Sequence, residues 1–292
     1  MSKVIVSLPH TLDAGSMYSV IGKVINTSRY PLHDDVIFDF STLNFIKPVG
    51  ITILSNLIEL LKIRGTKIKF GHCDVRTDAT KYLDDSGFFE KYVGQKLFSD
   101  SAVRSTTIPL QLLKHQETFA WLEYKLVPWL AGRLNMSSRS FETISVCLQE
   151  LFNNIQEHAH EEIGSIFVQQ YPQLNRVNIA LSDFGVGIPS NVYKKATAEH
   201  DGVAILIATR EGFTTQSYPG NRGAGLDLFL NTLARNRGKA IIYSNRGALS
   251  CTHEKRHPFL MQGKYPGTLF DIRFRTDTIE KADDTEDEFF EW

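Results

Sequence analysis

One predicted helix with two chemically different faces constrains this chain more than any other segment. It covers Cys147–Ala159, and the apolar residues in and just before it recur at helical spacing. The apolar stripe consists of Phe141, Ile144, Leu148, Leu151 and Ile155. Glu150 and Asn154, one turn apart, project from another face, where a carboxylate and a carboxamide can act together on one ligand. A solvated polar face also explains an isolated pair of this kind, so the choice depends on the motifs farther along the chain.

A glycine-containing turn follows the second of two predicted strands. Gly164–Tyr171 and Arg176–Ser182 alternate apolar and polar residues, which predicts an antiparallel pair. The second strand runs directly into Asp183-Phe-Gly-Val-Gly-Ile-Pro189, where Gly185 and Gly187 permit backbone shapes and close approaches that side chains forbid. Asp183, at the end of a buried strand, can accept a charge-assisted hydrogen bond from an exocyclic amine such as that of adenine. An ordinary tight turn is the alternative interpretation.

A second glycine-rich turn, Asn221-Arg-Gly-Ala-Gly-Leu-Asp-Leu-Phe229, opens a predicted helix. Exposed amides and the positive end of a helix suit a phosphate. The turn is not a Walker loop because no Gly-Lys-Ser/Thr follows, and no strand precedes it as a dinucleotide fingerprint requires. Gly212-Phe-Thr-Thr215 lies before it, and Gly267–Phe274 predicts a closing strand paired with Lys239–Ser244.

Taken together, residues 105–275 resemble the Bergerat ATP-binding fold of the GHKL superfamily, which includes gyrase-type ATPases, histidine kinases and anti-sigma-factor serine kinases. The resemblance implies Mg²⁺ and ATP as ligands, with Glu150 as general base and Asn154 as magnesium ligand. The positions that match the adenine-binding motifs are Asp183, Gly185, Gly187 and Thr268. The positions that match the lid and the phosphate-contact motif are Thr214, Thr215, Gly223, Gly225 and Leu226.

The first 95 residues alternate predicted strands and helices, which indicates parallel βαβ units. The predicted strands are Lys3–Pro9, Asp35–Phe40 and Lys67–Gly71, and the predicted helices are Leu12–Thr27, Val49–Ile63 and Asp78–Tyr92. Asp39–Gly50, followed by an apolar helix and the later Leu83–Phe89, is similar to the STAS domain of anti-sigma-factor antagonists. That family carries a phosphorylatable Ser before the Gly that opens its central helix, whereas Val49 precedes Gly50 here. We therefore expect a docking module that is not the chain's own phosphoacceptor; any other small α/β domain is the alternative.

Composition limits the remaining choices. No apolar run approaches the roughly 18 residues of a membrane helix, and the amino terminus lacks a signal-peptide pattern. Three widely separated cysteines suit a reducing compartment, so we expect a cytoplasmic protein without a membrane partner. Residues 277–292 form an acidic tail that we expect to be disordered, and the modest basic excess of the rest does not indicate nucleic acid.

The predicted architecture is α/β: a STAS-like α/β domain (1–95), then a GHKL α/β sandwich (105–276) whose mixed, largely antiparallel sheet is layered with helices. His115 lies too close to Asn154 for the phosphoacceptor hairpin of a histidine kinase, and no transducer domain follows residue 275. The chain therefore most resembles the anti-sigma-factor kinases. That resemblance implies a regulatory kinase that transfers the γ-phosphoryl group of ATP to a Ser or Thr of a sigma-factor- or STAS-related partner. The alternative is an ATP-gated binding or dimerisation module, and homodimer formation stays open.

Overall fold

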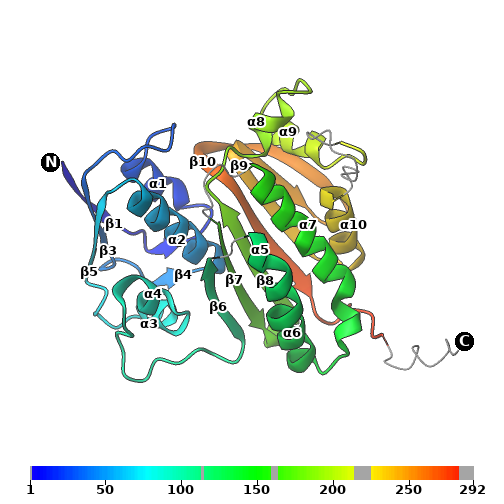
Figure 1. Cartoon of the computed structure of the whole chain (residues 1–292), viewed down its shortest axis with the longest axis horizontal. Helices are drawn as coiled ribbons and strands as arrows, with labels where there is room; N and C mark the ends of the chain where they lie inside the picture. The colour runs from blue at the N-terminus through cyan, green and yellow to red at the C-terminus, as the bar shows by residue number, and fades with distance from the viewer. Residues whose placement is uncertain (1, 113–114, 159–163, 214–224, 283–292) are drawn as a thin grey trace, which may run out of the picture.

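The N-terminal half of the molecule (β1 to α4) is built on parallel strands, and the C-terminal half (β6 to β10) on a five-stranded antiparallel sheet (Figure 1). The computed structural model describes residues 2–112, 115–158, 164–213 and 225–282. Side chains of residues 115–116 and 153–158 lie outside this description, as does the acidic tail from residue 283 onward. Within the described residues, no helix combines the length and apolarity needed to cross a bilayer.

The N-terminal half confirms the predicted parallel βαβ arrangement. Its three-stranded sheet has the order β1-β3-β5, and both strand pairs are parallel. A parallel two-stranded sheet, β2-β4, lies beside it. The strands are β1 (Lys3–Ser7), β2 (Thr11–Leu12), β3 (Asp35–Asp39), β4 (Phe45–Ile46) and β5 (Lys67–Gly71). The helices are α1 (Met17–Val24), α2 (Pro48–Ile63), α3 (Asp78–Asp85) and α4 (Phe88–Val93).

Two predicted helices in this half differ from the structure for local reasons. The helix expected from Leu12 begins only at Met17, because the Asp13 carboxylate accepts hydrogen bonds from the amides of Gly15 and Ser16 and holds a turn there. The single helix expected over 78–92 divides into α3 and α4 at Gly87, whose φ of 77° is left-handed.

Helix α2 is the central element of the N-terminal half. Pro48 occupies its first turn, which suits a residue without an amide hydrogen, and Gly65 at φ 79° follows its end. Every residue from Pro48 to Ile58 is buried. A helix that is buried on all sides must have neighbours on all sides.

The C-terminal half contains one sheet with the order β6-β7-β8-β10-β9, and every neighbouring pair in it is antiparallel. The expectation of a mixed sheet is therefore wrong, because no described pair in this sheet is parallel: β10 lies between β8 and β9 and runs antiparallel to both. The strands are β6 (Thr107–Leu112), β7 (Gly164–Tyr171), β8 (Arg176–Asp183), β9 (Lys239–Cys251) and β10 (Arg256–Arg275). The α-helices are α5 (His115–Trp121), α6 (Val127–Leu134), α7 (Glu142–His158), α8 (Ile188–Val192), α9 (Asp201–Ala208) and α10 (Gly225–Arg235). A π-helical turn (Leu122–Leu126) joins α5 to α6, and short 3₁₀ turns cover Ser138–Phe141 and Pro172–Leu174.

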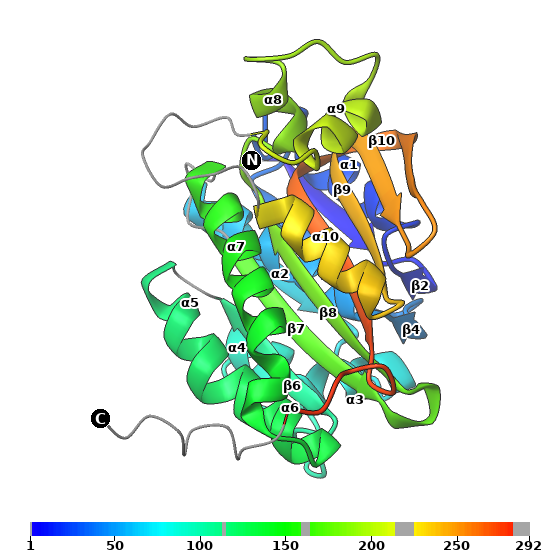
Figure 2. The same cartoon turned by 90° about the vertical axis from the view of Figure 1, so that its right-hand side faces the viewer.

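The five-stranded sheet is covered on both faces (Figures 1 and 2). Helices α5, α6, α7 and α10 cover one face of the sheet (Figure 2). There Ile144, Leu148 and Leu151 of the predicted α7 stripe belong to one core cluster with Ile166 and Val168 of β7. Helices α1 and α2 cover the other face, so that α2 lies between the parallel sheet and strands β7 and β8. One continuous core includes α2 together with Phe167, Phe184 and Tyr265.

Candidate functional site

Asp183, the last residue of β8, is the best-defined polar group of the candidate site. It is 3% exposed, and its Oδ1 accepts a hydrogen bond of 2.5 Å from the Gly185 amide. Its Oδ2 accepts a second bond of 3.1 Å from the Thr268 amide on β10. Burial raises the pKa of Asp183 from 3.8 to about 7, although the two amides and the charge of Arg29 act to lower it. The carboxyl group is therefore oriented by the backbone and titrates near neutral pH.

The glycines around Asp183 let two backbone segments come unusually close. Gly267 has φ 101°, and a Cβ placed there would lie 2.4 Å from the Asp183 carbonyl oxygen and 2.6 Å from the Gly185 nitrogen. Gly187 has φ 81°, and a Cβ there would lie 2.7 Å from Ser244 Oγ. Side chains at either position would push the turn after β8 away from β10. The structure thus brings the predicted residues Asp183, Gly185, Gly187 and Thr268 into one cluster.

Ser244 on β9 belongs to the same cluster, although no sequence motif pointed to it. This fully buried hydroxyl accepts a hydrogen bond of 2.9 Å from the Ile188 amide and donates one of 2.7 Å to the Gly267 carbonyl. It thereby fastens the turn after β8 to the β9–β10 hairpin. The register of the two strands places Ser244 opposite Thr268, which the sequence alone does not show.

Glu150 lies between α7 and α10, not on a solvated face. It is half-buried, and a Cβ added to Gly225, the first residue of α10, would lie 2.7 Å from Glu150 Oε2. A glycine at this position therefore gives the carboxylate direct access to the helix start. Leu226, the next residue, packs against the core beneath the two helices. The structure therefore also brings together a second set of predicted residues, Glu150, Gly225 and Leu226.

Both groups belong to the same end of the sheet. Gly164, which begins β7 shortly after the end of α7, pairs with Asp183. Figure 2 shows α7 and α10 side by side over the sheet. Asn154 lies on α7 beyond Glu150, but its side chain is outside the described residues. The predicted phosphate contacts Thr214, Thr215 and Gly223 also lie outside them.

No three His, Cys, Asp or Glu side chains in the described part of the chain are grouped closely enough to hold a metal ion. Magnesium takes oxygen ligands and often keeps several waters, so it is commonly held by one or two protein groups and the phosphates of a substrate. A magnesium ion that is bound to the phosphates of a nucleotide therefore does not need a cluster of three such side chains.

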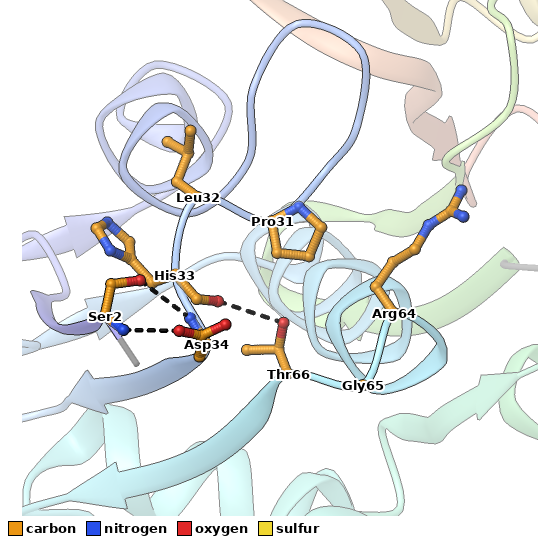
Figure 3. A pocket seen from close by; sticks show the side chains of 8 residues that line it. All are labelled: Ser2, Pro31, Leu32, His33, Asp34, Arg64, Gly65 and Thr66. Carbon is orange, nitrogen blue, oxygen red and sulfur yellow. Dashed lines mark hydrogen bonds between the residues drawn. The ribbon is translucent and has the colours of Figure 1, made fainter.

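Two cavities lie elsewhere and do not belong to this site. One of about 240 Å³ lies at the amino ends of β1, β3 and β5 (Figure 3). Its rim is fastened by a bond of 2.6 Å from the Ser2 amide to Asp34 and one of 3.5 Å from Thr66 Oγ1 to the His33 carbonyl. In open parallel α/β sheets, ligands bind at the carboxyl ends of the strands, which is the opposite edge.

The second cavity, of about 440 Å³, lies between α3 and β7. Tyr171, one of its lining residues, pairs with Arg176 at the beginning of β8, whereas Asp183 ends that strand. The cavity and the candidate site are therefore at opposite ends of the sheet.

No family model matches this chain, and no curated protein matches it in sequence.

Proposed function

We propose that the C-terminal half binds Mg-ATP and that the chain is a regulatory protein kinase acting on a Ser or Thr of a separate partner. The observation that carries this proposal is the buried Asp183 carboxyl, held by two backbone amides beside a glycine-lined turn. A buried carboxyl that titrates near neutral pH is costly to keep, and such groups concentrate at functional sites. The proposed architecture is a GHKL-like nucleotide domain behind a STAS-like domain.

In this proposal the ionised Asp183 carboxylate accepts a hydrogen bond from the exocyclic amine of adenine. A charged acceptor in a dry site makes one of the stronger hydrogen bonds available to a protein. The Thr268 hydroxyl, 3.4 Å from Ser244 Oγ, extends the polar network beside it. Gly187 lets the turn pack closely against Ser244 and so keeps Asp183 and Thr268 in one cluster.

The phosphates would lie toward the start of α10, whose first amides and helix dipole favour negative charge. Glu150 contacts that same helix start at Gly225. It would orient or deprotonate the attacking hydroxyl, since phosphoryl transfer depends mainly on positioning and charge neutralisation. Asn154, farther along α7, would contribute a magnesium ligand.

The chain's own STAS-like region is a poor acceptor for the phosphoryl group. Val49 has no hydroxyl, and the nearby Thr52 is fully buried with its hydroxyl bonded to the Val49 carbonyl. Ser41 is exposed, but its hydroxyl donates to Asp39. A separate protein, related to sigma-factor regulators, is therefore the proposed substrate.

Calorimetric titration with ATP and Mg²⁺ tests the nucleotide site. Asp183→Asn should weaken binding by about 1.5–3 kcal/mol, the worth of a hydrogen bond to a charged group. Asp84→Asn is the matched control, because Asp84 is 1% exposed and accepts from the Leu97 and Phe98 amides far from the site. No binding by the wild type at millimolar ATP would contradict the proposal.

The kinase activity is tested by incubating the protein and a candidate partner with Mg-ATP and mapping phosphate by mass spectrometry. Phosphate on a Ser or Thr of the partner is the expected result. Stoichiometric phosphate within residues 36–56 would instead identify a self-phosphorylating switch. ATP-dependent capture of the partner without phosphate would favour the nucleotide-gated binding module.

A further inference from the structure

The N-terminal half holds the strand end that carries Asp183 on both sides of that residue. Asn56 Nδ2, on α2, donates a hydrogen bond of 2.5 Å to Ser182 Oγ. Arg29 Nη1, from the loop after α1, donates one of 2.6 Å to the Phe184 carbonyl. The two immediate neighbours of Asp183 are thus each bonded to a residue from a distant part of the chain.

The Arg29 contact acts on the same peptide unit that binds Asp183. The Phe184 carbonyl and the Gly185 amide belong to one planar peptide group. Arg29 binds its oxygen, while its N–H donates to Asp183 Oδ1. Hydrogen bonds at both ends of one peptide polarise each other and fix its plane. The guanidinium therefore helps to determine where the Asp183 carboxylate points.

The loop that carries Arg29 is itself firmly supported. Arg29 has φ 67°, and the Asn26 side chain accepts from the Ser28 and Tyr30 amides. Figure 3 shows the base of the loop at Pro31, with Arg64 beside it. The Arg64 guanidinium lies 5.0 Å from the centre of the Tyr30 ring.

A contact from β10 also fastens this loop, because Lys264 Nζ donates a bond of 3.0 Å to the Thr27 carbonyl. The loop is therefore held by both halves of the molecule. A movement of the N-terminal half can thus change the contacts that the loop makes with the C-terminal half.

We propose that Arg29 is a positioning residue through which the N-terminal half sets the nucleotide affinity of the C-terminal half. A protein partner that draws the Arg29 loop away would release the Phe184–Gly185 peptide and weaken nucleotide binding. Conversely, bound nucleotide would strengthen the contact of the loop, because coupling between two sites is reciprocal. This inference rests on the proposed function and names the regulation of that site.

The titratable and charged groups that face Asp183 are few among the described residues. Arg29 approaches from the loop, and Tyr265 approaches from β10. Burial raises the pKa of Tyr265 far above its ordinary range, so this side chain stays neutral while Asp183 titrates. A change in the titration midpoint of Asp183 between variants at position 29 therefore measures the effect of the Arg29 side chain on that carboxyl group.

The test compares the full-length wild type with Arg29→Met, Arg29→Lys and Tyr82→Phe. Tyr82→Phe is the matched control, since it removes a hydrogen bond of 3.1 Å to Gln169 that also joins the two halves, at the other end of the sheet. Two quantities are measured: the calorimetric Kd for Mg-ATP, and the titration midpoint of the Asp183 carboxyl from its ¹³C chemical shift. The signal is assigned by its absence in Asp183→Asn.

Arg29→Met should raise the Kd by about 5- to 150-fold, the range typical of coupling between sites, and should raise the Asp183 midpoint. Arg29→Lys should recover most of both changes because it keeps the charge, and Tyr82→Phe should change neither. A loss of stability alone would leave the midpoint unmoved, whereas loss of the Arg29 charge raises it, because that charge lowers the pKa of Asp183. Thermal unfolding of each variant verifies that it is folded.

The outcomes separate this inference from the proposed function. If Arg29→Met matches Tyr82→Phe in both quantities, the inference is wrong even when the wild type binds ATP. If the wild type binds no ATP but the midpoint rises in Arg29→Met, the proposed function fails, the control of nucleotide affinity fails with it, and only the electrostatic coupling of Arg29 to Asp183 stands.

Discussion

Burial of the Asp183 carboxyl makes this one residue a source of pH-dependent stability. Its pKa in the folded protein, about 7, lies above the ordinary value of 3.8. Between these two values the folded state binds more protons than the unfolded state, so the free energy of unfolding falls as the pH rises. Carboxyl groups whose pKa is lowered by partners, such as Asp85 beside Lys81 and Arg104, act in the opposite sense but at more acidic pH.

The pH prediction concerns the window from about pH 4 to pH 7. The wild type should lose up to about 4 kcal/mol from this group across the window, at about 1.4 kcal/mol per pKa unit. Asp183→Asn should flatten this part of the profile, because an amide does not titrate. Urea denaturation at pH 5 and pH 8 measures the difference, and an equal slope in the two proteins would show that Asp183 does not carry the effect.

Glu150 should serve chemistry more than binding. Glu150→Gln keeps the side-chain volume beside Gly225 but removes the base, so phosphotransfer should fall by about 10²–10⁴-fold while ATP affinity changes little. Calorimetry and a turnover assay give the two numbers. Glu142→Gln, at an exposed position on the same helix, is the control. An equal loss of binding and rate would make Glu150 a structural residue.

At the level of single residues, the sequence predicted the groups whose chemistry is local. Asp183, Gly185 and Gly187 lie within one short segment, and the structure brings them together in the turn after β8. Ser244 and Arg29 could not be predicted, because their roles depend on packing between segments far apart in the chain. An isolated serine in a strand and an isolated arginine in a loop carry no pattern.

At the level of elements, periodicity predicted most strands and helices, because burial on one face repeats at short range. It predicted the parallel strands of the N-terminal half and the antiparallel pair of β7 and β8. It did not predict that the expected mixed sheet is antiparallel throughout its described pairs. It also overlooked the break at Gly87, since the apolar pattern continues through both α3 and α4. Backbone features decided these cases, and hydrophobic patterns do not encode them.

Helix α2 provides a prediction at this scale. A Cβ on Gly50 would lie 2.4 Å from the Leu12 carbonyl oxygen and 2.8 Å from Ile46 Cγ1. Gly50→Ala should therefore destabilise the protein by about 1–3 kcal/mol, as overpacking of a core does. Gly22→Ala in α1 is the matched control, because nothing lies within 4 Å of its Cβ position.

The control should be neutral or stabilising by up to about 1 kcal/mol, because alanine is the better helix former. Urea denaturation measures both variants. If the two substitutions change the free energy of unfolding alike, the close contact between α2 and the segment after β1 is not as described.

At the scale of the whole molecule, the boundary predicted between residues 95 and 105 does not separate two cores. Residues of α2 share one cluster with Phe167 on β7 and Tyr265 on β10. The sequence shows that α2 is apolar but not which surface covers it, since that depends on the matching shape of a sheet formed much later in the chain.

A shared core predicts that both halves unfold in one transition. Among the described residues, tryptophan occurs at Trp121 and Trp129, so the fluorescence of these two reports on the C-terminal half, whereas far-ultraviolet circular dichroism reports on both. The two signals should give coincident denaturation curves with one midpoint. A separate step seen only by circular dichroism would show that the N-terminal half unfolds on its own.

The position of α2 between two sheets also matters during synthesis. At about 5–20 residues per second, the ribosome completes α2 about 6 to 24 seconds before it completes β8. Throughout that interval the side of α2 destined for β7 and β8 has no partner. Thr52 and Asn56, whose polar atoms later bond to Ser165 and Ser182, lie on that side. Until then, water can hydrogen-bond to these polar groups. They therefore make the uncovered side of α2 less apolar and less prone to associate with other nascent chains.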